Sequence, residues 1–153
     1  MKSLQHHIDG RWVAPVVTGE RFPVIDPATE SQVAEICMGS AADVDLAVAA
    51  AGRAFASFAV TPLDARLDAL RRINEVFKRR FDEMADAITT EMGAPRDMAR
   101  EAQAAAGPGH IEATIKAAQQ LDWEVRIDGS NVVREPIGVC GLVTPWNWPI
   151  NQI

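Results

Sequence analysis

The sequence predicts an α/β fold, because strand signals and helix signals occupy separate blocks of the 153 residues. Residues 6–38 hold short apolar runs separated by turn residues, the pattern of antiparallel strands. From 40 to 121 apolar side chains recur at helical spacing, and from 123 to 143 short alternating and apolar runs return. A chain of this length can bury a core of its own as one domain.

The bulk composition excludes several classes of function. A net charge of −6 leaves no basic stripe to neutralise phosphates, so no nucleic-acid partner is expected. No apolar run reaches the ~18–20 residues that cross a bilayer, so no membrane association is expected. Residues 1–7 lack the apolar core of a signal peptide. Two cysteines are too few for a disulfide framework, and together these features predict a cytoplasmic protein.

Two local features could suggest chemistry but have a simpler explanation. His6 and His7 have no third ligand at a suitable spacing, so a solvated terminus is favoured and no metal site is expected. Cys140 lies in an apolar run with no base nearby in sequence, which predicts an inert, buried thiol rather than a nucleophile.

The N-terminal block is expected to consist of strands and turns. Asp9 and Gly10 lie between apolar neighbours and signal a hairpin turn. Residues 22–27 are expected to be extended, since Pro27 disfavours helix at the residue before it. Residues 28–31 are then expected to turn, and 33–37 to form a short return strand.

The first helix is expected to start after Ser40, which with Asp43 three residues later fits a variant of the capping box. A second helix is expected to have Thr61 as its cap and Pro62 at its first position, and to end at Gly93. Each helix should bury one apolar stripe. The two stripes are Val44, Val48, Ala51, Phe55 and Phe58, then Leu63, Leu67, Leu70, Ile73, Phe77 and Phe81.

A third helical region runs from about residue 96 to 121, and Gly107, Pro108 and Gly109 interrupt it. A proline in mid-helix removes a hydrogen bond and crowds the preceding turn, at a cost of ~3 kcal/mol. We therefore expect a kink or two separate helices at this point.

Alternating runs on both sides of residues 128–131 predict a β-hairpin. A lone two-stranded hairpin is barely stable in water, so this one should pair with a partner chain or with another part of the same polypeptide. The apolar run 137–143 is expected to be a strand that leads into a turn at residues 145–149.

The last stretch resembles the aldehyde dehydrogenase superfamily, through the run from Arg134 to Gly141 and the following Thr144-Pro145-Trp146-Asn147-Trp148-Pro149. Earlier pieces fall in the order of that family. They are Asp9-Gly10-Arg11-Trp12, Asp26-Pro27-Ala28-Thr29, Asp43-Val44-Asp45, Ala54-Phe55, Arg66 and Glu91-Met92-Gly93. The resemblance therefore covers essentially the whole chain, and the ordered set is more specific than any single piece.

The resemblance implies the N-terminal part of an aldehyde dehydrogenase fold, incomplete, with the start of a Rossmann-like cofactor domain and an oligomerisation hairpin. Residues 1–122 would supply the N-terminal hairpin and the helical part of the cofactor-binding domain. Residues 123–136 would be the oligomerisation β-hairpin, which implies a homo-oligomer. Residues 137–153 would hold the first strand of the Rossmann-like sheet and the turn with the catalytic asparagine.

The same resemblance implies roles for five residues of that turn. Asn147 matches the catalytic asparagine, whose side-chain amide donates to the carbonyl oxygen of the aldehyde substrate. Thr144, Pro145, Trp146 and Asn147 match the contacts to the nicotinamide cofactor, NAD or NADP. Trp148 stands where many members have a phenylalanine that lines the aldehyde tunnel, and its bulk could narrow the substrate path. The identity of the aldehyde, and the choice between NAD and NADP, stay open.

In the family, the cofactor-binding lysine, the glycine-rich turn, the glutamate base and the nucleophilic cysteine follow later than these 153 residues. The chain is therefore expected to be an N-terminal fragment of a cytoplasmic NAD(P)-dependent aldehyde dehydrogenase, inactive by itself. The alternative is a non-enzymatic short protein that acts as a binding or oligomerisation module through its hairpin. Sheet edges left without neighbours also predict self-association.

Overall fold

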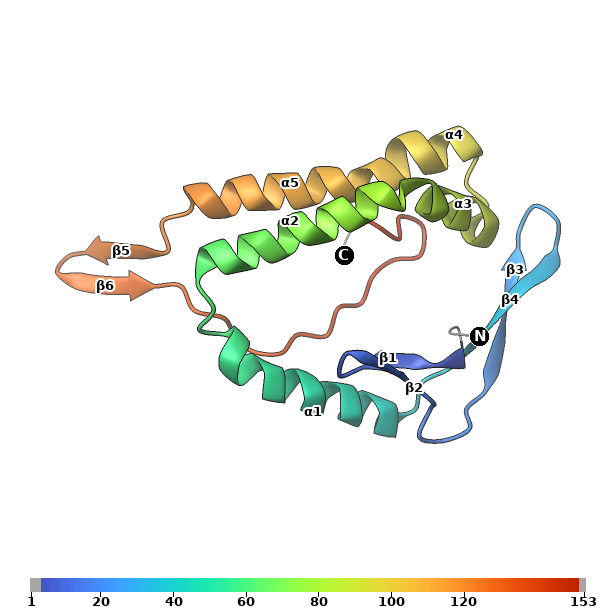
Figure 1. Ribbon diagram of the computed structural model, residues 1–153, viewed down its shortest axis with the longest axis horizontal. Coiled ribbons are helices and arrows are strands. Elements are labelled where there is room, and N and C mark those ends of the chain that lie inside the picture. Colours follow the sequence, from blue (N-terminus) through green and yellow to red (C-terminus); the bar gives the residue numbers. More distant parts are fainter. Residues whose placement is uncertain (1–3, 152–153) are drawn as a thin grey trace.

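The helices α2 (Leu63–Arg79) and α5 (Ala105–Gln120) run side by side and form the body of the molecule. The helix α1 (Ala41–Phe58) lies apart from them (Figure 1). The computed structural model describes residues 4–151. Outside the described residues lie 1–3, which belong to the segment compared with a signal peptide, and 152–153, which belong to the predicted part 137–153. The elements are β1 (His6–Ile8), β2 (Arg11–Val13), β3 (Arg21–Asp26), β4 (Ser31–Cys37), α1 (Ala41–Phe58), α2 (Leu63–Arg79), α3 (Phe81–Met92), α4 (Arg96–Met98), η2 (Ala99–Ala104), α5 (Ala105–Gln120), β5 (Glu124–Ile127) and β6 (Ser130–Val133).

The strands of the described residues form three separate antiparallel hairpins. β1 and β2 turn at Asp9 and Gly10, whose φ angles are 55° and 74°. β5 and β6 turn at Asp128 and Gly129, whose φ angles are 47° and 82°. Two successive residues with positive φ are the mark of a type I′ turn, which favours Asp-Gly. Both of these predicted hairpins are confirmed.

The β3–β4 hairpin confirms the predicted extended segment and its turn. Asp26 Oδ1 accepts a hydrogen bond from the backbone N–H of Ala28, and the Asp26 carbonyl accepts one from Glu30, both at 2.8 Å. The turn packs against the end of α3, where a Cβ on Gly93 would lie 2.7 Å from Pro27 Cγ. Gly93 has a left-handed φ of 80°, so the predicted helix end is confirmed and no larger residue fits there.

The start of α1 confirms the predicted capping box. The backbone N–H of Asp43 donates to Ser40 Oγ at 3.4 Å, and Asp43 Oδ2 accepts from the backbone N–H of Ser40 at 2.8 Å. Asp43 Oδ1 also accepts from the backbone N–H of Val16 at 2.8 Å. One buried carboxylate thus ties the loop after β2 to the first turn of the helix.

The predicted buried stripe of α1 is wrong for Val44, Val48 and Phe58, while Ala51 and Phe55 are half-buried. Val44, Val48 and Phe58 are 58%, 53% and 58% exposed. β1 is the element that contacts α1 most, and the buried Ala50 lies on that side of the helix. Helical spacing shows which residues share a face, but it does not show which face meets a neighbour.

The second predicted helix is divided in two at Arg80, whose φ and ψ of −107° and 19° are not helical. Pro62 stands before the first residue of α2 rather than inside it. The Thr61 hydroxyl does not cap α2, since it donates to a carbonyl in the last turn of α1 at 3.4 Å. Within the predicted stripe Leu67 is buried, but Ile73 is 55% exposed.

The third helical region is not interrupted at Pro108, so the predicted position of the break is wrong. α5 passes through Pro108, and the distortion lies just upstream in the π-helical segment η2. Proline lacks the N–H that would bond to the carbonyl of Ala104, and its ring crowds that carbonyl. A widened π turn that ends at Ala104 accommodates both effects without ending the helix.

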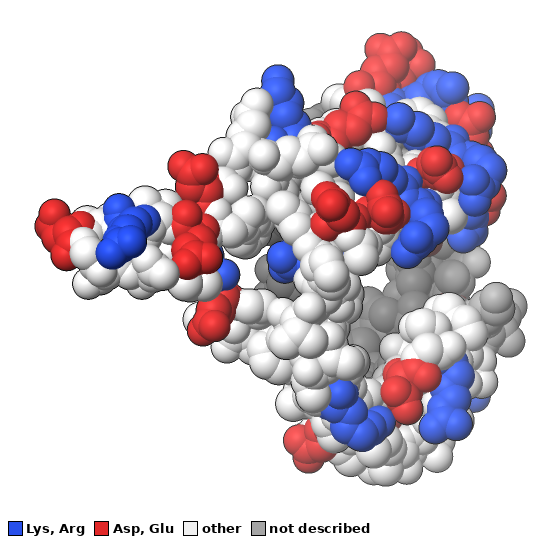
Figure 2. Space-filling model, turned by 60° about the vertical axis from the view of Figure 1, so that its left-hand side comes forward, with Lys and Arg blue, Asp and Glu red and all other residues white. Residues whose placement is uncertain are grey.

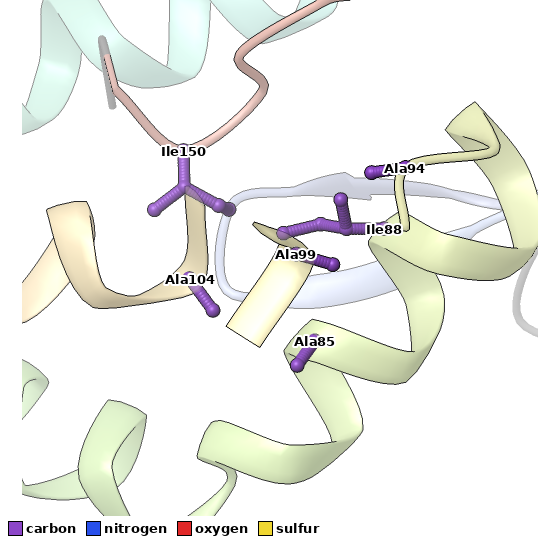
Figure 3. Close-up of a cluster of buried hydrophobic side chains, with 6 residues drawn as sticks. All are labelled: Ala85, Ile88, Ala94, Ala99, Ala104 and Ile150. Carbon is purple, nitrogen blue, oxygen red and sulfur yellow. The ribbon is translucent and has the colours of Figure 1, made fainter. Parts of the chain in front are cut away.

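The buried core lies between α3, η2 and the C-terminal turn (Figure 3). A Cβ on Gly107 would lie 2.8 Å from both Ile150 Cγ2 and Phe77 Cζ. The absence of a side chain at Gly107 therefore allows α2, α5 and the turn to meet. The core residues are Ala85, Ile88, Ala94, Ala99, Ala104 and Ile150.

The run 137–143 is not a strand in this structure. Residues 134–145 leave the β5–β6 hairpin and pass between α1 and the α2–α5 pair without regular structure (Figure 1). A strand needs a hydrogen-bonded neighbour, and no residue within 4–151 pairs with this run. Ile137 and Val143 are accordingly 94% and 96% exposed. A place for this run in a larger sheet stays a prediction.

Opposite charges are interleaved over the visible face of the helical layer (Figure 2). The ion pair between Lys78 Nζ and Glu112 Oε1, 2.6 Å apart, links α2 to α5. Exposed pairs of this kind contribute less than about 1 kcal/mol each, so the helices depend mainly on apolar packing. No described helix combines the length and the apolar character needed to cross a bilayer.

The packing at Gly107 gives a first prediction. We expect Gly107→Ala to lower the free energy of unfolding of the 153-residue chain by ~1–3 kcal/mol, because the new methyl group overpacks the contact of Ile150 and Phe77. Gly109→Ala in the same helix is the matched control, since nothing lies within 4 Å of its Cβ position. The control should stabilise by up to ~1 kcal/mol through helix propensity. Urea unfolding measures the free energy of unfolding of both variants. An equal change in the two variants would contradict the close packing at Gly107.

The capping carboxylate gives a second prediction, on pH. Hydrogen bonds from the Ser40 hydroxyl, the Val16 backbone and the Ser40 backbone lower the pKa of Asp43 from 3.8 to about 2. A depressed pKa stabilises the fold above the unfolded value, and this contribution is lost as the pH falls from about 4 to about 2. Asp43→Asn should therefore differ from the parent in unfolding midpoint at neutral pH but not near pH 2. Asp45→Asn is the control. If the unfolding midpoints of Asp43→Asn and the parent differ equally at neutral pH and near pH 2, the Asp43 carboxylate is not the source of the pH-dependent stability.

Candidate active-site turn

The candidate site residues lie on a turn at residues 144–151 that packs on the helical layer. The backbone N–H of Asn151 donates to the Trp148 carbonyl at 3.1 Å and closes the last part of the turn. Ile150 is 9% exposed and enters the core beside Ala104 (Figure 3). The turn is thus preformed in this chain, although the segment that precedes it is in no sheet.

Two hydrogen bonds from the π-helical segment and α5 add to this packing. Gln103 Nε2 donates to the Asn147 carbonyl at 3.0 Å, and His110 Nε2 lies 2.8 Å from Asn151 Oδ1. A carbonyl only accepts, so the amide nitrogen of Gln103 must face it. Gln103 is 1% exposed, whereas the bond to His110 is open to solvent. The bond from Gln103 is therefore the better shielded of the two.

The predicted site residues lie on the open side of this anchor. Thr144, Pro145, Trp146 and Asn147 are exposed, Trp146 at 79%, and Trp148 is half-buried. Within the described part of the chain, the side-chain amide of Asn147 makes no hydrogen bond, so its two N–H groups are available to a bound molecule. The turn places one neutral donor and an exposed indole next to each other in sequence.

The expectation of a buried Cys140 is wrong, because the structure has this thiol exposed. The reason is that residues 134–145 have no sheet neighbours to cover them. Cys37, at the end of β4, is half-buried instead. Across residues 4–151 no three His, Cys, Asp or Glu side chains are grouped closely enough to hold a metal ion.

A groove lies away from this turn. It has a volume of about 770 Å³ and follows α2 and α3. Its apolar part includes Ile73, Val76 and Met84, and Arg72 and Arg80 border it. None of residues 144–148 lines it, so the groove and the candidate site are separate features.

Gln103 was missed from the sequence, because a neutral amide in an alanine-rich helix belongs to no motif. Met98 and Ala102 are exposed, whereas Ala99 and Gln103, each one residue later, are buried. The π turn shifts the inward face by one residue, and only the nearby Gly-Pro-Gly hinted at such a distortion.

Comparison with known proteins identifies the family to which the turn belongs. The model of the aldehyde dehydrogenase family matches residues 12–153. A 3-succinoylsemialdehyde-pyridine dehydrogenase from a Pseudomonas species is 47% identical over 150 residues, which are 97% of this chain and 31% of that protein. The chain therefore spans about a third of the length of this curated relative.

Solved structures agree in fold. An aldehyde dehydrogenase from Bartonella henselae superimposes with a TM-score of 0.91 at 42% identity, over 95% of this chain and 31% of that one. A variant of aldehyde dehydrogenase C from Pseudomonas syringae, in complex with NAD+ and octanal, gives 0.94 at 41% identity, over 99% and 31%. The predicted resemblance and the predicted partial fold are confirmed.

The exposure of Cys140 gives a prediction that needs no activity. A thiol reagent such as dithionitrobenzoate should modify Cys140 several-fold faster than Cys37 in the folded chain, because reaction requires access to the sulfur. Cys37→Ser and Cys140→Ser isolate the two rates, and the denatured chain gives the reference. Slow modification of Cys140 in the folded chain would show that residues 134–145 are covered.

Proposed function

Because the chain belongs to the aldehyde dehydrogenase family, we propose that it is the N-terminal part of an NAD(P)-dependent enzyme that oxidises an aldehyde to a carboxylate. The observation that supports this most directly is the exposed amide of Asn147 on a turn that buried contacts hold in place. Such an enzyme would be cytoplasmic. The 153 residues alone would not turn over an aldehyde, because they carry a donor for the substrate but no activated nucleophile.

Asn147 would stabilise negative charge on the substrate. Attack on an aldehyde carbonyl moves an electron pair onto its oxygen, and a neutral N–H donor already in position stabilises that oxygen without reorganisation. The Gln103 bond to the Asn147 carbonyl and the burial of Ile150 supply this fixed position. Loss of one such donor typically lowers kcat by ~10²–10³.

The residues before Asn147 fit a nicotinamide ring. Thr144 has a hydroxyl that can donate or accept, and Trp146 offers a largely exposed flat surface. Their backbone groups, with those of Pro145, are in no described ladder and are open to a ligand. When bound, NAD or NADP would supply the oxidant, while Thr144 to Asn147 bind and orient it. Two solved relatives, from Pseudomonas syringae and Mycobacterium tuberculosis, carry NAD+.

Two further roles complete the proposal. Trp148, the half-buried residue that follows Asn147, would line the path of the aldehyde and restrict its width. The hairpin at 123–136 would pair with another subunit in a homo-oligomer, which is supported by the exposure of Ile127 and Val133 at 53% and 54%. Residues 1–122 and 137–153 would then belong to the cofactor-binding domain.

A second candidate, a non-enzymatic oligomerisation module, rests on the same exposed hairpin. The two proposals differ in what the turn at 144–148 does, since a module needs no donor at Asn147. Sedimentation of the free chain tests the shared part, because unpaired edges should make it self-associate. A stable monomer would count against both roles of the hairpin.

The role of Asn147 is tested in an enzyme in which these 153 residues replace the matching part of the unsubstituted Pseudomonas syringae protein, because the solved variant has a cysteine replaced by alanine. We call this the joined enzyme. With octanal and NAD+, Asn147→Ala should lower kcat by ~10²–10³, because the oxyanion loses its donor. Asn151→Ala, which removes an exposed amide on the same turn, is the matched control and should stay within about twofold.

Two results would contradict the proposal. One is a folded joined enzyme without turnover, and the other is an Asn147→Ala variant that keeps the activity of its parent. The free 153-residue chain, assayed with propanal and NAD, should form no NADH. Turnover that follows the purified free chain would show that it is an enzyme by itself.

A further inference from the structure

Gln103 is a buried polar side chain that lies outside the turn 144–151 and contacts it from the helical layer. It is 1% exposed and lies in η2 between Ala99 and Ala104, which are both fully buried. A buried amide is costly unless it is hydrogen-bonded, whereas a leucine would fill such a site without that cost. The Gln103 amide nitrogen donates a hydrogen bond to the backbone carbonyl of Asn147 at 3.0 Å.

We propose that Gln103 is a positioning residue that sets the direction of the Asn147 side chain. The inference rests on the proposed function, and it adds a residue 44 positions earlier in the chain to the site. A hydrogen bond to the carbonyl of Asn147 restricts ψ of that residue, and the Cα–Cβ bond turns with the backbone. Gln103 therefore acts on the substrate through Asn147, without contact of its own.

A second anchor makes this restraint effective. Ile150 is buried three residues after Asn147, in the space that Gly107 leaves open. The backbone from 147 to 150 is then fixed at both ends, at one by a hydrogen bond and at the other by packing. Because this segment is fixed at both ends, the Asn147 amide loses little conformational entropy when it binds the oxyanion.

The π turn explains why this residue can reach the turn. The inward residues of η2 are Ala99, Gln103 and Ala104, so the π-helical segment carries Gln103 on the side that faces the turn. Gln103 Oε1 has no hydrogen-bond partner within the described residues. The amide is therefore held by one bond, which makes its loss easy to detect.

The test compares three variants in the joined enzyme. Gln103→Leu should lower kcat at least about tenfold, with KM for octanal within about twofold, because the misdirected donor loses an interaction that is made in the transition state and not in the bound substrate. Asn74→Leu is the matched control. It removes another buried amide, which bonds to Glu112 and touches no part of the turn, and kcat should stay within about twofold.

Gln103→Glu makes kcat depend on pH if the hydrogen bond to Asn147 matters, whereas a residue that only stabilises the fold would give no such pH dependence. A carboxylate repels the Asn147 carbonyl, whereas a protonated carboxyl group donates to it. The kcat of this variant relative to the parent should rise as the pH is lowered. If Gln103→Leu does not fold, the pH dependence of kcat in Gln103→Glu tests the positioning role by itself.

The Trp148 amide resonance of the free chain provides a measurement that does not depend on activity. That amide shares a peptide group with the Asn147 carbonyl, so its chemical shift should move in Gln103→Leu and not in Asn74→Leu. A joined enzyme without turnover would overturn the proposed function and leave Gln103 to be judged by this shift. Unchanged kcat and an unchanged Trp148 shift in Gln103→Leu would overturn the positioning role, as would equal losses in Asn74→Leu.

Discussion

The contact between Ile150 and the bare backbone at Gly107 couples the C-terminal turn to the helices. It requires a glycine in α5, small residues in η2, and a chain that returns from the far hairpin to the same place. Burying an isoleucine contributes ~1.5–3 kcal/mol, a large fraction of what holds a short turn. Since Pro108 follows Gly107 and displaces the helical irregularity into η2, one short sequence creates the gap and the π turn that presents Gln103.

Much apolar surface outside this contact has no neighbour among the described residues. Val44 and Phe58 on α1, and Ile137 and Val143 on the returning segment, are all more than half exposed. Exposed apolar surface of this extent usually marks a contact with a partner. The chain spans about a third of the length of these relatives.

Local signals were read correctly from the sequence where neighbouring residues decide the conformation. The Asp-Gly turns, the Ser40 cap and the Gly93 helix end depend on contacts within a few residues, and all three are present. Features set by distant contacts were not. Which stripe of α1 is buried, where the helix distorts near Pro108, and whether 137–143 forms a strand depend on packing partners that spacing does not reveal. Gln103 belongs to this second group, because its acceptor lies 44 residues away.

Helical contacts, and not a sheet, hold the turn that carries Asn147. Amide hydrogen exchange of the free chain distinguishes a docked turn from a loose one. We expect the Asn151 amide, bonded to the Trp148 carbonyl beside the buried Ile150, to exchange slowly together with the amides of α5. The amides of 137–143 should exchange at the rate of an unfolded chain. Equally fast exchange at Asn151 and along 137–143 would show that the turn is not docked, and would contradict the account.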